Sequence, residues 1–140
     1  MIEGTINTEM EIKKDDKIAT SGIYGDNRDV VKLLKTDFLE NNEKFDVVGF
    51  FRKSPGHYFL LIMILEHSVD HSPITFETIL KKIPNKFGSR SKIFKIFKEA
   101  VDIGYLIKKK NYKDGREQIY YPSVSFIKQT NEWLSIFQKI

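Results

Sequence analysis

The chain has 140 residues, of which 41% are hydrophobic and 13% aromatic, and its formal net charge is +4. This length and composition suit one compact folded domain and exclude an intrinsically disordered chain. The chain has no cysteine, so disulfides, thiol redox sensing and Cys-ligated zinc are excluded, which is compatible with a reducing cytoplasm.

Positive charge is concentrated in one stretch. Residues 81–116 carry 12 Lys or Arg against 3 Asp or Glu, whereas residues 1–50 carry 7 against 11. This asymmetry predicts a surface that binds a polyanion, although a basic surface that meets only solvent is the common alternative. No apolar run reaches the length of a membrane span, and no secretory signal pattern is present at the N-terminus. We therefore expect a cytoplasmic protein with no membrane partner.

The first part of the chain predicts a polar arm followed by a helix. Residues 1–26 hold isolated apolar residues without a clear period, and we expect a flexible N-terminal arm there. From Arg28 the apolar residues recur at helical spacing, with an interruption at Asn41-Asn42 and a helical continuation that ends by Lys53. We therefore divide the chain into this arm and one domain over residues 27–140.

Two further helices have recognisable start signals. Ser54-Pro55 provides an N-cap and a proline at the first helical position, and the helix that it begins runs to about Val69. The stretch 58–65 of this helix is apolar all round, so we expect it to lie centrally. Thr75 caps a second helix over about residues 76–83, which the following proline ends.

The basic stretch contains an amphipathic helix over residues 90–103. Ser89 is a suitable N-cap, and Gly104 can take the left-handed conformation just past the end. At roughly 100° per residue, one broad sector is apolar, and it contains Ile93, Phe94, Ile96, Phe97, Ala100, Val101 and Ile103. The opposite sector is cationic in its first turns, as in a helix that enters a DNA groove. It contains Ser91, Lys92, Lys95, Lys98, Glu99 and Asp102.

A β-hairpin is predicted next, because Asp114-Gly115 is a strong signal for a two-residue turn. The strands on either side are apolar at the base of the hairpin and basic toward its tip. This distribution describes a wing that contacts a phosphate backbone without reading sequence. Arg116 can also pair with Asp114 and brace the turn. The cations expected to contact DNA are Lys108, Lys109, Lys110, Lys113 and Arg116.

Helix, glycine, strand, basic tip, strand and helix in this order resemble the winged helix-turn-helix of the multiple-antibiotic-resistance regulator (MarR) family. The resemblance covers the chain from about Gly56 to the C-terminus, with a longer turn at 84–88. It implies a mainly α fold with a small β-hairpin wing (α+β) and double-stranded DNA as a partner. Members of the family often bind a small-molecule effector, but no residue here carries that property over, so an effector stays unknown. The family pattern is matched at Ser89, Arg90, Ser91 and Ile93, at Gly104, Tyr105 and Leu106, at Asp114 and Arg116, and at Pro122 and Ser123.

The expected recognition helix offers different kinds of contact along its length. Its first two turns can reach base edges, and Lys98, further along, is expected to contact the backbone. Ser89 is expected to cap the helix beside a bound phosphate. Arg90 either reaches a phosphate from the helix start or lies along the surface. The DNA-binding residues expected here are Ser89, Arg90, Ser91, Lys92, Lys95 and Lys98.

A final helix is expected over about Phe126–Gln138, with Ser123 or Ser125 as its cap. Its apolar residues, Trp133 among them, form more apolar surface than a terminal helix should expose, so they need a partner in this chain or in a second copy. We expect flanking dimerisation helices, at 28–53 and at this C-terminal helix. A symmetric homodimer would place two recognition helices about one DNA turn apart.

The sequence gives little support for metal or catalytic chemistry. His67 and His71 are four apart and could share a metal with Asp70 or Glu66, but a third well-placed ligand is lacking. The serines lack a plausible base and acid, and no Gly-rich phosphate loop is present. We therefore expect neither an enzyme nor a cofactor or metal.

The leading interpretation is a sequence-specific, double-stranded-DNA-binding transcriptional regulator that acts as a homodimer. Two alternatives stay open. One is a winged-helix accessory module of a replication, phage or plasmid DNA-handling assembly, and the other is a protein-interaction winged helix without DNA activity. Salt-dependent binding to random duplex separates the last from the first two.

Overall fold

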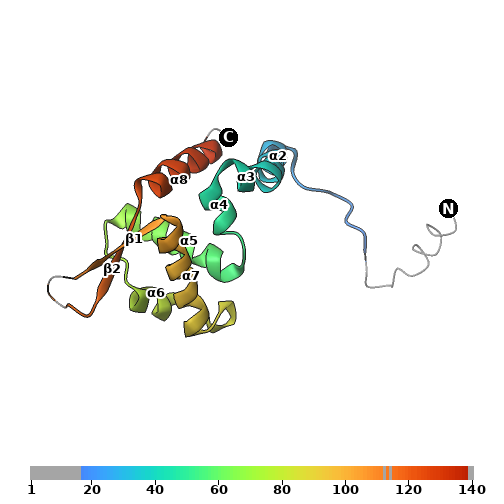
Figure 1. Ribbon diagram of the computed structural model, residues 1–140. Helices are drawn as coiled ribbons and strands as arrows, with labels where there is room; N and C mark the ends of the chain where they lie inside the picture. Colours follow the sequence, from blue (N-terminus) through green and yellow to red (C-terminus); the bar gives the residue numbers. More distant parts are fainter. Residues whose placement is uncertain (1–16, 112, 114, 139–140) are drawn as a thin grey trace.

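Figure 1 shows the computed structural model, which describes residues 17–111, 113 and 115–138. A helical body carries one two-stranded antiparallel hairpin, so the predicted mainly α class with a small β wing is confirmed. Across these residues, no helix is long and apolar enough to span a membrane. The elements are η1 Gly25–Asn27, α2 Arg28–Thr36, η2 Asp37–Asn41, α3 Asn42–Lys44, α4 Asp46–Phe50, α5 Pro55–Asp70, α6 Phe76–Lys82, η3 Asn85–Phe87, α7 Arg90–Ile103, β1 Leu106–Lys110, β2 Gln118–Pro122 and α8 Val124–Phe137.

The N-terminal helical region is more broken than the sequence predicts. α2 begins at Arg28 as expected, but the chain then widens into the π-helical turn η2, and Phe45 is extended (φ −119°, ψ 103°) between α3 and α4. The continuation ends at Phe50, before the expected Lys53. Residues 17–24 are exposed and lead away from the body in Figure 1, whereas residues 1–16 of the expected arm lie outside the described residues.

A buried polar network explains why this region departs from a continuous helix. Asp37, 5% exposed, accepts hydrogen bonds from Asn41 Nδ2 (2.7 Å), Trp133 Nε1 (2.7 Å) and Arg52 Nη2 (2.5 Å). Burial alone would raise the pKa of Asp37, but these hydrogen bonds and the Arg52 charge together lower it. The widened turn thus places the Asp37 carboxylate between three parts of the fold. Its hydrogen bonds connect η2 to Arg52, which follows α4, and to Trp133 of α8.

The apolar face of α8 finds most of its partner inside the same chain. Trp133 is 3% exposed, and Phe126 is fully buried against Phe51 with ring centroids 6.0 Å apart. Ser123 is the cap, since its hydroxyl accepts from Phe126 N (3.2 Å). Trp133 is therefore a core residue, and this part of the apolar surface of α8 has its partner in this chain, which is the first of the two expected possibilities.

The helix α5 lies centrally but is not buried all round. Ser54 caps it as expected, and Leu60, Leu61 and Ile64 are fully buried in the core. Tyr58 and Ile62, however, are exposed on its outer side. The sequence of this stretch has no polar face, so it does not indicate which side of α5 is exposed. The packing of the other helices decides which side is exposed.

The wing is an antiparallel hairpin whose strands pair from Leu106↔Pro122 to Lys110↔Gln118. Beyond these pairs Asn111 N donates to Glu117 O (2.9 Å), and the Asn111 side chain donates to Glu117 Oε1 (2.7 Å) and accepts from Lys113 N (3.0 Å). Asp114 lies outside the described residues, so the expected turn at Asp114-Gly115 stays a prediction.

The network around Asp37 makes a stability prediction. Asp37→Asn would leave the Arg52 cation without its buried partner, so we expect a loss of about 3 kcal/mol in the free energy of unfolding at pH 7. Because the pKa of Asp37 is lowered in the folded protein, its contribution is present above the pKa of the unfolded chain and is lost as pH falls through the folded value.

The measurement is urea unfolding of both proteins at pH 7 and at pH 4 and below. The exposed Asp29 of α2 provides the matched control, since Asp29→Asn removes the same charge outside the network. Equal unfolding midpoints for wild type and Asp37→Asn at pH 7 would contradict the assigned role of the network.

Candidate nucleic-acid interface

The helix α7 is held with one side in the core and the other in solvent. Its buried residues are Ile93, Ile96, Phe97 and Ala100. Ser89 caps it, with its hydroxyl accepting from Lys92 N (3.2 Å), and Gly104 ends it at φ 100°, a conformation that glycine takes without strain. Because these buried residues fix which side of α7 faces the core, a row of polar residues at positions i, i+4, i+7 and i+11 faces solvent. This row is Ser91, Lys95, Lys98 and Asp102.

The turn before α7 is folded against α5. Residues 85–87 form the 3-10 turn η3, and Phe87 packs on Phe59 with ring centroids 5.9 Å apart. A Cβ at Gly56 would come within 2.8 Å of the Phe87 carbonyl oxygen, so the two segments are in close contact. The longer turn is therefore part of the packed structure that positions the start of α7.

Arg90 lies along the surface, the second of the two expected positions. Its guanidinium donates to the Glu77 carboxylate on α6 and stacks on the Phe76 ring, 5.1 Å from the centroid. The hydrogen bond from Arg90 lowers the pKa of Glu77. Both side chains are exposed, so this ion pair adds little stability. It holds Arg90 against the first turn of α6, where Arg90 and Ser91 line the same hollow.

Another flank of α7 faces α5 and includes Glu99. His57 Nδ1 lies 2.7 Å from Ser54 Oγ, and its Nε2 lies 3.9 Å from Glu99 Oε1, whereas the sequence shows no evident partner for this histidine. Burial lowers the pKa of His57, although Glu99 acts to raise it and Lys53 and Lys92 act to lower it. Glu99 therefore faces His57 on this flank and lies outside the outward row, and Lys92 is near enough to His57 to act on its charge.

The lysines of the wing divide between two faces. Alternate residues of a strand point to opposite sides, and Leu106 of β1 points into the core. Lys108 shares its side and lines a shallow hollow with Lys98 of α7, whereas Lys109 points to the other face with Ile107. Lys113 and Arg116 are exposed near the tip, and the expected Arg116–Asp114 pair lies outside the described residues.

Phe94 is an exposed aromatic residue that the sequence reading places in the apolar sector. It is 51% exposed, beside the outward row and toward the wing, and it contacts the Phe76 ring at 5.4 Å between centroids. Its neighbours Phe97 and Ile93 are fully buried. The only sequence signal for this difference is the position of Phe94 at the edge of the sector, next to Ser91 and Lys98.

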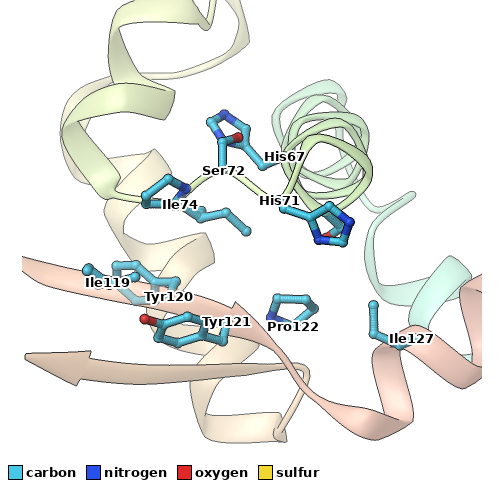
Figure 2. A pocket seen from close by; sticks show the side chains of 11 residues that line it. His67, His71, Ser72, Ile74, Ile119, Tyr120, Tyr121, Pro122 and Ile127 are labelled. Carbon is cyan, nitrogen blue, oxygen red and sulfur yellow. The ribbon is translucent and has the colours of Figure 1, made fainter.

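A separate hollow of about 550 Å³ lies away from α7, between the end of α5, β2 and the start of α8 (Figure 2). His67 lines it, with Nδ1 2.8 Å from Ser72 Oγ and Nε2 3.5 Å from Lys82 Nζ. His71 lies in the left-handed conformation at the end of α5, and the two imidazoles point apart in Figure 2. Within the described part of the chain, no three His, Cys, Asp or Glu side chains gather into a metal site.

Comparisons with known proteins add little to this geometry. No protein-family model matches the chain, and no curated protein matches it. Among solved structures, the chain is similar to the adhesin competence repressor (AdcR) from Streptococcus pyogenes. The two sequences are 15% identical, the match covers 83% of this chain and 81% of that one, and the TM-score is 0.37. The functional argument therefore rests on the residues of the candidate interface.

Proposed function

We propose that the chain is a double-stranded-DNA-binding transcriptional regulator that acts as a homodimer in the cytoplasm. The observation that carries this proposal is the outward row of α7, in which Ser91, Lys95 and Lys98 face solvent beside Lys108 of β1. In the described residues, no ion pair or hydrogen bond holds Lys95 or Lys98.

Unpaired cations on one face favour a polyanionic partner. Lys98 and Lys108 line one hollow, and Lys95 precedes Lys98 by one turn on the same face of α7, so like charges gather here. A bound phosphate backbone relieves their repulsion while releasing counterions. Among the acidic groups nearby, Glu77 is paired with Arg90, and Asp102 lines the hollow with Lys98 and Lys108, where the two lysines outnumber it. In this arrangement α7 enters the major groove and the wing follows the backbone.

The regulatory role is supported by the resemblance to the MarR family. The matched positions include the cap Ser89 and the terminal Gly104, both of which have the backbone roles expected of them at the ends of α7. These positions set where the helix starts and ends, and they do not name an operator or an effector.

The test of this proposal is DNA binding by Lys95→Ala. Lys95 lies in the second turn of α7, where a side chain can reach base edges, so its loss should weaken binding to the preferred duplex by about 1–3 kcal/mol. Binding to a scrambled duplex should weaken much less. The preferred duplex is selected from a random pool, and both duplexes are titrated by fluorescence anisotropy at one salt concentration.

Lys128→Ala is the matched control, because Lys128 is exposed on α8, far from the candidate interface. It should leave both affinities unchanged. If neither duplex binds with a dependence on salt, the chain is not a DNA-binding protein and the protein-interaction alternative stands. Binding without any preferred duplex would instead favour the DNA-handling alternative.

The wing gives a second prediction that distinguishes two neighbouring lysines. Lys108 faces α7 and Lys109 points to the other side, so Lys108→Ala should flatten the salt dependence of binding by about one log–log unit per subunit, and Lys109→Ala by less. Neither should change the preferred sequence. Equal slopes for the two variants, or a changed preference, would show that the wing lies on the DNA in another orientation.

The homodimer is proposed on the apolar side of α2 and η2. α2 buries none of its residues, and Val31, Leu34 and Phe38 are exposed at helical spacing i, i+3 and i+7, with Phe38 72% exposed. Leu39 extends this face. Such an apolar stripe on an otherwise polar helix fits the same stripe of a second copy, and two-fold pairing is the commonest way to cover it.

A charge on this stripe should break the dimer. We expect wild type to sediment as a dimer at micromolar concentration and Leu34→Glu to sediment as a monomer with an unchanged circular dichroism spectrum. Thr36→Glu introduces the same charge on the opposite, exposed side of α2 and should leave the dimer intact. A wild-type chain that stays monomeric with and without DNA would contradict the proposed dimer.

A further inference from the structure

We infer that Phe94 contacts the 5-methyl group of a thymine in the major groove and makes this chain selective for thymine at one position of each half-site. This inference rests on the proposed function and adds a specificity-determining residue to it. The lysines of the same face are long and flexible cations, whereas Phe94 is a rigid apolar side chain that can distinguish bases by shape.

Phe94 is held in place on one side only. Its ring meets Phe76 at 5.4 Å between centroids with an interplanar angle of 86°, and Phe76 in turn packs on the buried Phe97 at 5.5 Å. The remainder of the Phe94 ring is exposed. Packing against Phe76 therefore fixes the position of the Phe94 ring and leaves much of the ring exposed. A side chain that contacts a ligand needs both properties.

The ring forms a ridge between two shallow hollows. On the α6 side, a hollow of about 370 Å³ is lined by Phe76, Arg90, Ser91 and Phe94. On the wing side, a hollow of about 310 Å³ is lined by Phe94, Lys98, Val101, Asp102, Lys108 and Tyr120. An apolar ridge next to Lys98 and Lys108 fits a partner that carries negative charge at its rim and an apolar group deeper in a groove.

A DNA major groove has this distribution, with phosphates at its edges and base edges at its floor. Among the base edges, the C5-methyl of thymine is the apolar group that an aromatic side chain contacts favourably. Asp102 lines the wing-side hollow together with Lys98 and Lys108, so this hollow keeps a net positive charge that an uncharged apolar protein segment would not match. The charges beside Phe94 therefore favour duplex DNA as the occupant.

The experiment removes only the methyl group. In the preferred duplex, each thymine is replaced in turn by deoxyuridine, and binding of the full-length chain is titrated at one salt concentration. Wild type should bind about 3- to 5-fold more weakly when the contacted thymine is replaced, as expected for one buried methyl group. Phe94→Ala should bind the thymine and deoxyuridine duplexes equally well.

Ile103→Ala is the matched control, because Ile103 is another half-exposed apolar residue of α7, nine positions after Phe94 and so on the opposite side of the helix. It should keep the wild-type loss on deoxyuridine replacement. Phe94→Leu, which keeps an apolar side chain, should retain part of that loss and covers the case in which Phe94→Ala does not fold.

Three outcomes would overturn the inference. They are a wild type that is indifferent to every thymine replacement, a Phe94→Ala variant that keeps the wild-type loss, and a preferred duplex without thymine. In each of these the salt-dependent binding of the proposed function would still be seen. If the chain bound no duplex at all, both the proposed function and this inference would be wrong.

Discussion

The burial of Ile93, Ile96, Phe97 and Ala100 decides how α7 is rotated about its axis, and the candidate function depends on this rotation. Side chains at this spacing cannot leave the core without exposing apolar area at about 25 cal/mol per Å². The opposite side of the helix must therefore face solvent, whatever residues it carries. In this chain that side carries Ser91, Lys95 and Lys98, and the binding chemistry follows from the packing.

A second constraint acts at the other end of the molecule. Asp37 accepts hydrogen bonds from Trp133 and Arg52, and this network joins α8 to the widened turn after α2. Because Phe126 and Trp133 of α8 are buried within the chain, the proposed dimer contact rests on the exposed apolar residues of α2 and η2. In Figure 1 α2 lies at the opposite side of the body from the wing, which separates the proposed dimer contact from the proposed DNA contact.

The sequence predicts the ends of the helices well, because those signals are local. Ser54, Thr75, Ser89 and Ser123 each accept a backbone N–H at a helix start, and Gly104 ends α7 in the left-handed conformation. A cap depends only on residues a few positions away, so one sequence is enough to find it.

Features that depend on distant residues were not predictable in the same way. Trp133 is buried because Asp37, far away in the chain, accepts its N–H, and no local pattern carries that information. Phe94 and Phe97 lie in one sector of α7 and both contact Phe76 of α6, whereas Phe97 also packs on Tyr120 of β2 and is buried.

The outward face of α7 as the DNA contact is tested most directly by mapping amide chemical-shift changes of the ¹⁵N-labelled chain on addition of duplex DNA. The account predicts that the largest changes fall on Ser91, Lys95 and Lys98 and on β1 around Lys108, and that they fade as salt is raised. Changes confined to α2, or none at low salt, would contradict it.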